Sequence, residues 1–220
     1  MDATAIITEQ RTSYQGTGRL IGTRQNFVRF AGCSIGRCPI RSFCDEPFSL
    51  TRVNGGARDV YRIVEIAVGE VGPGGWIHIT GGEPLDQPEV LERLVVLAQA
   101  EGLRVHLQTS GSAAVPVPID WLTVSPKAPA TRLIQDRGHE LVVVYDGQPI
   151  DELLDYRAHT EFDHYFLVPK WIPEHRRDGD AATNASEVVR VLDQLNTTFR
   201  VSGGAQWMLT LQAHKYLKVY

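Results

Sequence analysis

Residues 27–46, FVRFAGCSIGRCPIRSFCDE, contain all three cysteines of the 220-residue chain. The stretch begins with a short strand-like run at 27–30 and continues into a loop with glycine, proline and arginine, where no regular element is expected. Cys33, Cys38 and Cys44 lie on this one loop and can converge on one centre. Structural zinc sites and ordinary electron-transfer clusters normally take four protein ligands, so three thiolates indicate a cubane with one iron free for a ligand that is not protein.

The three cysteines alone allow other interpretations. A zinc ion could be held by the thiolates and a histidine from another segment, because the loop itself contains no histidine. The three cysteines could also form one disulfide and one free thiol, or simply be three small buried side chains. The choice among these depends on the rest of the chain.

Helices and strands are predicted to alternate after the cysteine loop. Apolar residues spaced i, i+3, i+4 and i+7 predict helices, and short β-rich runs bounded by turn residues predict strands. The helices are expected at 58–69, 86–102, 149–156 and 185–195. The strands are expected at 76–79, 103–107, 121–124, 141–145, 164–168 and 208–211.

This alternation indicates the α/β class, with a mainly parallel sheet covered by helices. About seven β units are too few for a closed eight-fold barrel of about 250 residues. We therefore expect a partial, open β/α barrel, formed by a single domain over residues 1–220.

Four loops directly follow predicted strands and should share one rim of the sheet, since ligands of such sheets bind at the carboxyl ends of the strands. The glycine at Gly82 lets a ligand approach the backbone closely. Glu83 can accept from a ligand ammonium, Ser110 offers a hydroxyl, and Ser125 with Lys127 suits a carboxylate. Taken singly, each is equally well explained as a turn or a solvated side chain. The four loops are the cysteine loop, Thr80–Pro84, Gln108–Gly111 and Ser125–Lys127.

Composition excludes several classes of protein. The net charge is −4 and basic residues are spread along the chain, so we expect no nucleic-acid partner. No apolar run approaches the roughly 18 residues of a membrane span, and the N-terminus lacks the pattern of a secretory signal. An odd cysteine count without a signal favours a reducing compartment, and we expect a cytoplasmic protein without a membrane partner.

Together these motifs resemble the radical S-adenosylmethionine superfamily and, more narrowly, the 7-carboxy-7-deazaguanine synthase family. The sequence QGTG at 15–18 is similar to that family's Gln-Gly-Glu-Gly, and 28–33 looks like its lead-in to the first cluster cysteine. Residues 211–215, LQAHK, are similar to its C-terminal Leu-Gln-Thr-His-Lys. The Gly-Gly-Glu-Pro turn at 81–84 is shared across the superfamily. The resemblance extends from about Gln15 to the last residue.

The resemblance implies a [4Fe–4S] cluster whose open iron is chelated by the amino and carboxylate groups of S-adenosylmethionine. Reductive cleavage then gives a 5′-deoxyadenosyl radical, which in this family abstracts hydrogen from 6-carboxy-5,6,7,8-tetrahydropterin. Ring contraction with loss of ammonia gives 7-carboxy-7-deazaguanine, an intermediate of deazapurine (queuosine-type) biosynthesis. The resemblance also implies Mg²⁺, an electron donor such as flavodoxin, and a homodimer.

The same resemblance implies roles for individual residues. Arg29 suits a carboxylate through paired donors, and Gln15 suits an amino-pyrimidinone edge. The cluster ligands would be Cys33, Cys38 and Cys44. The contacts to S-adenosylmethionine would be Phe43, Asp45, Gly82, Glu83, Ser110, Ser125, Pro126 and Lys127. The contacts to the pterin would be Tyr14, Gln15, Gly16, Arg29, Thr80, His214 and Tyr220.

The chain departs from the family in four places. Its cysteine spacing is Cys-x4-Cys-x5-Cys, whereas the superfamily pattern is Cys-x3-Cys-x2-Cys. Glu46 replaces a threonine that binds Mg²⁺ in the family, and a carboxylate is also a good ligand for a hard cation. Thr17 stands where the family has a substrate-facing glutamate, which affects the pterin contact. Val168 stands where the family has a glutamine before proline, so only its backbone could contact the adenine of S-adenosylmethionine.

Two other functions are compatible with parts of the sequence. One is a radical S-adenosylmethionine activase, or a related enzyme on another substrate, against which the motifs at both chain ends argue. The other is a zinc-binding interaction module, which the four separate ligand-like loops disfavour.

Overall fold

The computed structural model describes residues 3–36, 38–39, 44, 46–171, 184–202 and 206–218, with the side chains of 198–202 excepted. The strands are β1 (Thr4–Tyr14), β2 (Arg24–Phe30), β3 (Gly56–Asp59), β4 (Trp76–Gly81), β5 (Arg104–Thr109), β6 (Trp121–Val124), β7 (Arg137–Tyr145), β8 (Glu161–Pro169) and β9 (Trp207–Leu209). The helices are α1 (Val60–Val71), α2 (Pro88–Ala100), α3 (Ile150–His159), α4 (Ala185–Ser202) and α5 (Ala213–Leu217).

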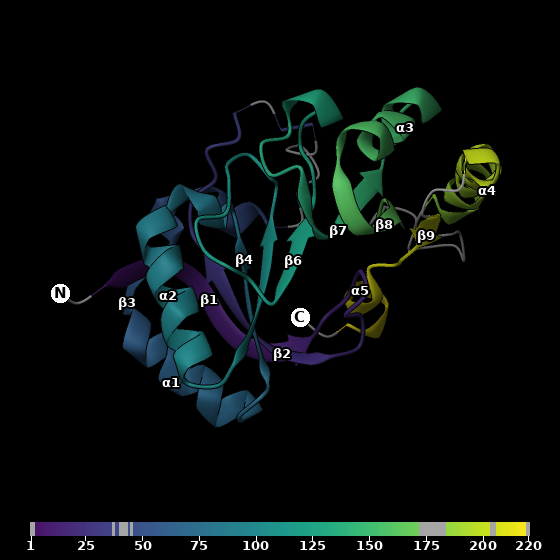
Figure 1. Ribbon diagram of the computed structural model, residues 1–220. Helices are drawn as coiled ribbons and strands as arrows, with labels where there is room; N and C mark the ends of the chain where they lie inside the picture. The colour runs from purple at the N-terminus through teal and green to yellow at the C-terminus, as the bar shows by residue number, and fades with distance from the viewer. Residues whose placement is uncertain are drawn as a thin grey trace.

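The strands form one sheet in the order β3-β1-β2-β4-β5-β6-β7-β8-β9 (Figure 1). β1 pairs antiparallel with both β2 and β3, and every pairing from β2 to β9 is parallel. Within the described residues the outer strands β3 and β9 have one neighbour each, so the sheet is open. The predicted open, mainly parallel α/β architecture is therefore confirmed.

The helices form where the apolar periodicity predicted them. α1 begins after Asp59, whose carboxylate accepts from the Tyr61 amide at 2.7 Å and caps the helix. Its buried stripe includes Ile63 and Val64, and the helix ends at Gly72, which has a positive φ of 72°. Figure 1 shows α1 and α2 together on one flank of the sheet, and α3 and α4 beside β7–β9 at the other end.

The N-terminal hairpin was not predicted. β1 buries Ala5 and Ile7, but most of its other side chains are polar and only partly covered. Gln10 shows how they are accommodated: its amide donates to the Asn26 side chain at 3.0 Å and to the Ile63 carbonyl at 2.8 Å. The strand depends on contacts with β2 and α1 that its own sequence pattern does not reveal.

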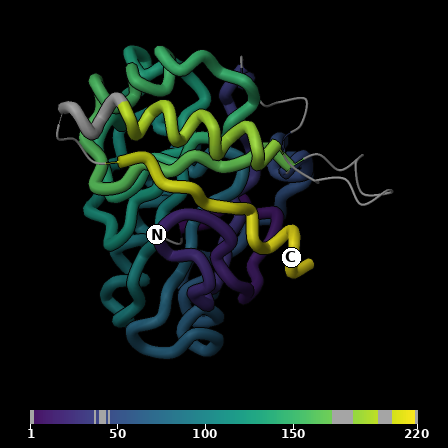
Figure 2. Tube along the Cα trace, turned by 90° about the vertical axis from the view of Figure 1, so that its right-hand side faces the viewer, coloured from purple at the N-terminus to yellow at the C-terminus, as the bar shows by residue number. Residues whose placement is uncertain are grey.

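The C-terminal segment crosses to the N-terminal loop that joins β1 and β2 (Figure 2). The Ala213 amide donates to the Gly16 carbonyl at 2.9 Å, and the Gly18 amide donates to the Thr210 hydroxyl at 3.0 Å. The N-terminal loop and the C-terminal segment, which carry the most family-specific motifs, are therefore in contact.

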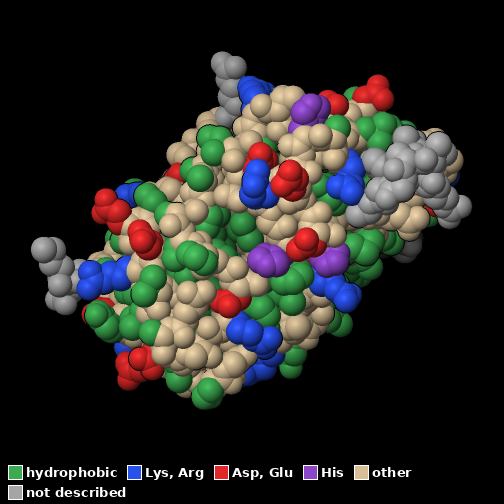
Figure 3. Space-filling model, viewed as in Figure 1, with side chains coloured by type: hydrophobic (Ala, Val, Ile, Leu, Met, Phe, Trp, Pro, Cys, Tyr) green, Lys and Arg blue, Asp and Glu red, His purple; other side chains and the backbone are tan. Residues whose placement is uncertain are grey.

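The surface agrees with the charge pattern of the sequence. The face seen in Figure 3 carries acidic and basic side chains interspersed. Among the helices of the described part, none is both long and apolar enough to cross a membrane.

Candidate functional site

A cavity of about 260 Å³ lies where the parallel strands end. Its walls come from β2, β4 and β5, from the loops that follow them, and from the N- and C-terminal motifs. The cavity brings together most of the residues predicted from separate motifs. These are Tyr14, Gln15, Gly16, Arg29, Cys33, Cys38, Cys44, Glu46, Thr80, Gly82, Ser110, Ser125, Lys127 and His214.

The other five predicted site residues fall into two groups. Glu83 and Pro126 are described but do not contribute to the walls of the cavity. Phe43, Asp45 and Tyr220 lie outside the described residues.

The three cysteines line the same cavity, are partly exposed, and form no disulfide with one another. Burial raises the pKa of Cys33; the Ile35 backbone opposes this, and the nearby carboxylates of Glu83 and Asp86 add to it. In the described part of the chain, no three His, Cys, Asp or Glu side chains are already gathered as a metal site. Three cysteine thiols around one cavity nevertheless fit the donor set of an iron–sulfur cluster.

Glu83 is buried behind the cavity wall, with 1% of its surface exposed. Its carboxylate accepts from the Leu85 amide at 3.1 Å, from the Thr109 hydroxyl at 2.6 Å, and from the Ser110 amide at 2.9 Å. The Ser110 hydroxyl is a fourth donor. Glu83 therefore fixes the turn after β4 to the turn after β5, and a direct contact with a ligand ammonium stays a prediction.

Replacing Glu83 with Gln should weaken this connection, because an amide NH2 would then face donors instead of accepting from them. We expect a loss of about 1–3 kcal/mol in the free energy of unfolding, the usual effect of leaving buried polar groups unpaired. Chemical denaturation would measure it. The same substitution at the exposed Glu92 of α2 is the control and should change stability little. Equal stability of both variants would contradict the role of Glu83.

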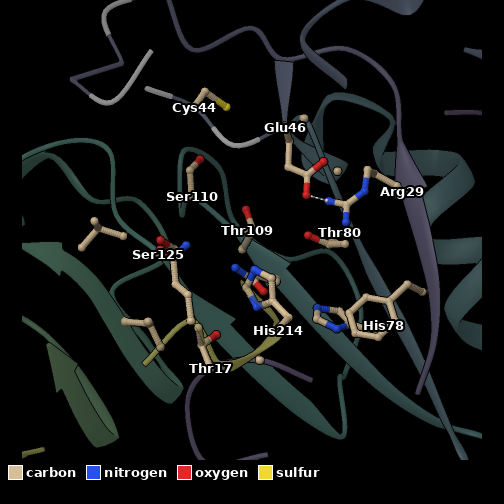
Figure 4. Close-up of a pocket in the computed structure, with 18 of the residues that line it drawn as sticks. Thr17, Arg29, Cys44, Glu46, His78, Thr80, Thr109, Ser110, Ser125 and His214 are labelled. Atoms are coloured by element: carbon tan, nitrogen blue, oxygen red, sulfur yellow. Dashed lines mark ion pairs between the residues drawn. The ribbon is translucent and has the colours of Figure 1, made fainter. Parts of the chain in front are cut away.

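Arg29 lies at the edge of the cavity between two carboxylates, with 11% of its side chain exposed. Its Nη1 is 2.8 Å from Glu46 Oε1 (Figure 4), and its Nε is 3.1 Å from Glu9 Oε2. Arg11 also pairs with Glu9. In this structure, Glu46, the predicted Mg²⁺ ligand, thus binds the residue predicted to hold the substrate carboxylate.

Ser125 and Lys127 meet as the sequence predicted. The Lys127 ammonium donates to the Ser125 carbonyl at 2.8 Å and to its hydroxyl at 2.7 Å. The Ser125 amide donates to the Thr109 carbonyl at 2.8 Å, which places this turn beside the one after β5. One hydroxyl and one cation are therefore presented together on the cavity wall.

The loop after β1 is held from both sides. His214 packs so closely on Gly16 that an added Cβ would lie 1.9 Å from its Nδ1. On the other side, the Arg19 amide donates to Glu140 Oε2 at 2.7 Å. Gln15, only 4% exposed, is fixed within the loop by an Nε2 bond to the Thr17 carbonyl at 3.1 Å.

A buried polar chain that the sequence analysis missed supports this loop from inside the sheet. The Thr123 hydroxyl donates to Glu140 Oε1 at 2.6 Å, and His106 connects Thr123, at 2.8 Å, to Gln25, at 3.0 Å. Burial raises the pKa of Glu140, opposed by bonds from Thr123 and the Arg19 backbone, and burial lowers the pKa of His106 to about 3. The chain therefore connects Glu140, which holds the loop after β1, to Gln25 on β2.

Several lining residues were also missed as site residues, among them His78, Gln108, Gln212 and Lys215. His78 precedes Thr80 by two positions on β4. Since alternate residues of a strand share a face, the prediction for Thr80 contained the signal for His78.

No protein-family model matches the chain. Curated relatives do: the chain is 34% identical to the 7-carboxy-7-deazaguanine synthase of Bordetella pertussis, covering 93% of this chain and 94% of that protein. It is 35% identical to the Burkholderia multivorans protein of the same name, with the same coverage. The crystal structure of QueE from Escherichia coli covers 96% of this chain and 95% of that chain, with a TM-score of 0.66 and 19% identity, and it shows the same fold.

Proposed function

The chain belongs to the 7-carboxy-7-deazaguanine synthase family of radical S-adenosylmethionine enzymes, and on that premise we propose that it converts 6-carboxy-5,6,7,8-tetrahydropterin to 7-carboxy-7-deazaguanine. The reaction is a ring contraction with loss of ammonia. One observation carries the proposal: a single cavity gathers the three thiols, the turns after β4, β5 and β6, and the motifs from both chain ends.

The donors around the cavity fit the cofactors that the family implies. Cys33, Cys38 and Cys44 would hold a [4Fe–4S] cluster beside S-adenosylmethionine. Bound there, the pair supplies one-electron, hydrogen-abstracting chemistry, while the protein binds, orients and excludes water. Gly82, which lines the cavity, would contact S-adenosylmethionine, and the Ser125–Lys127 pair suits its carboxylate. Phe43, Asp45, Glu83, Ser110 and Pro126 complete the proposed set.

The pterin would lie against the opposite wall. Arg29 and Thr80 project from neighbouring strands, since their Cα atoms are paired in the register of β2 and β4. Gln15 lies in the loop after β1, and His214 lies in the C-terminal segment. A backbone hydrogen bond connects these two segments. We propose that Arg29 binds the pterin carboxylate and that Gln15 and His214 contact the ring system, with Tyr14, Gly16 and Tyr220 as further contacts.

An anaerobic assay tests the proposal directly. Reconstituted, reduced protein is mixed with S-adenosylmethionine, Mg²⁺ and 6-carboxytetrahydropterin, and the products are analysed by mass spectrometry. A product with the mass of 7-carboxy-7-deazaguanine is expected. Release of 5′-deoxyadenosine without this product would retain the radical chemistry and rule out the substrate. A colourless zinc protein that leaves S-adenosylmethionine intact would refute both.

We propose that Glu46 handles the divalent cation, which must then compete with Arg29 for the carboxylate. Replacing Glu46 with Ala should remove the dependence of product formation on Mg²⁺, measured as a titration against a chelated control. Glu9 provides the matched variant, because it is the other carboxylate on Arg29 and lies outside the proposed metal position. Glu9→Ala should keep the Mg²⁺ response. An unchanged response in Glu46→Ala would show that the cation binds elsewhere.

The remaining assignments rest on the family and on the thiols. Cysteines that must stay reduced to bind a cluster favour a reducing compartment, and we infer the cytoplasm. A flavodoxin-type electron donor and a homodimer are proposed from the family alone.

A further inference from the structure

His78 lies on the floor of the cavity and has no role in the assignments above. In the register of β2 and β4 it is paired with Phe27, whereas Thr80 is paired with Arg29. Residues two apart on a strand point the same way, about 7 Å apart. His78 is therefore one step deeper than Thr80, on the same face, and Figure 4 shows it below Thr80 and Arg29 and beside His214.

The faces of the His78 ring are well packed. The His106 ring stacks on it with centroids 3.9 Å apart and planes 20° apart, and Phe27 lies 4.6 Å away on the neighbouring strand. These contacts fix the ring plane. They do not provide a hydrogen-bond partner for either nitrogen on the polar edge of the imidazole.

That polar edge lacks a partner. His78 is 1% exposed, and neither Nδ1 nor Nε2 has a hydrogen-bond partner among the described residues. Buried polar side chains are nearly always hydrogen-bonded, and an unpaired one is costly. His106, stacked on it, has both nitrogens bonded. An unpaired imidazole in the wall of the cavity points to a ligand that supplies the missing bond.

The protonation state limits what that ligand can be. Burial lowers the pKa of His78 well below its ordinary value, and the Arg29 guanidinium acts in the same direction. The Gln108 side chain opposes this, although it lies outside hydrogen-bonding geometry with either ring nitrogen. The ring is therefore neutral, with one donor and one acceptor nitrogen. Such an edge matches an uncharged heterocycle and not a carboxylate, for which Arg29 is better suited.

We propose that His78 contacts the substrate, hydrogen-bonding through a ring nitrogen to the amino-pyrimidinone part of the pterin. This inference rests on the proposed function. With the pterin carboxylate at Arg29, near the rim, the fused ring extends inward and reaches His78. His78 thereby determines how deep and in which orientation the ring is held.

The test measures binding without turnover. 6-Carboxytetrahydropterin is titrated anaerobically into cluster-loaded, unreduced protein with S-adenosylmethionine present, and Kd is determined. His78→Phe keeps a flat ring on His106 but removes both nitrogens, and we expect Kd to rise about five- to tenfold, as for the loss of one hydrogen bond. Iron content should match the wild type, because the substitution changes none of the three cysteines. His78→Asn and His78→Gln each restore one nitrogen position, and one of them should recover affinity.

His164→Phe is the matched control, since His164 is a histidine of β8 that does not line the cavity. Its Kd should equal that of the wild type. An unchanged Kd in His78→Phe, or an equal loss in His164→Phe, would overturn the inference. If His78→Phe fails to take up its cluster, His78→Leu is measured in its place. Failure of the wild type to bind the pterin or form product would instead refute the proposed function, so the two failures are distinct.

Discussion

Replacing Cys38 with Ala should abolish the iron–sulfur cluster and all product formation. The expectation follows from the number of donors: the chain has three cysteines, which form no disulfide with one another and all line one cavity. A cluster held by three thiolates has no spare protein ligand, so loss of one leaves two. Iron content and the visible absorption of the anaerobically reconstituted protein measure the cluster, and mass spectrometry measures the product.

Ser34→Ala is the control for this experiment. Ser34 lies in the same loop. The substitution removes the bond from its hydroxyl to Asp86 at 2.6 Å and keeps the bond from its amide to the same carboxylate at 2.7 Å. This variant should keep its cluster. A full complement of iron in Cys38→Ala would show that Cys38 is not a ligand and that the extended Cys-x4-Cys-x5-Cys spacing uses another donor.

The parts of the fold that the sequence predicted are those with local signals. α1 is an example: the Asp59 cap, the apolar stripe that includes Ile63 and the glycine at Gly72 all lie within one short segment. The parallel strands were also found, because buried strands are continuous apolar runs bounded by turn residues. The structure mainly changes their bounds; α4, for instance, extends to Ser202.

The elements that were missed have polar sequences that depend on distant partners. β1 carries Gln10, whose amide nitrogen donates to groups on β2 and α1. β3 is four exposed residues paired with the first half of β1. α5 is a short helix of five residues, below the length that periodicity can reveal. Nothing within these segments marks them as regular structure.

The same distinction holds for the site. Motifs that follow strands predicted which residues meet at the rim, because topology alone brings the ends of parallel strands together. Side-chain partners were not predictable. The pairing of Arg29 with Glu46, the burial of Glu83 under four donors and the unpaired ring of His78 each depend on the register of neighbouring strands or on the course of a loop.

Replacing Gly82 with Ala should disrupt the rim strongly. Gly82 lies between two backbones: an added Cβ would be 2.0 Å from the Gly32 carbonyl oxygen and 2.4 Å from that of Ser49. These carbonyls cannot move freely, since the first accepts from the Glu83 amide and the second from the Gly32 amide, both at 2.8 Å. The methyl group would therefore separate the turn after β4 from the start of the cysteine loop.

We expect Gly82→Ala to lower the free energy of unfolding by about 1–3 kcal/mol, as for overpacking elsewhere. Cleavage of S-adenosylmethionine should fall about a hundredfold, because small displacements of positioned groups have effects of that size. Gly69→Ala in α1 is the control: nothing lies within 4 Å of an added Cβ there, and alanine favours a helix. Denaturation and 5′-deoxyadenosine release measure the two effects. Wild-type cleavage in Gly82→Ala would mean that the cysteine loop and the Gly82 turn move independently, and that their contact does not position the cofactor.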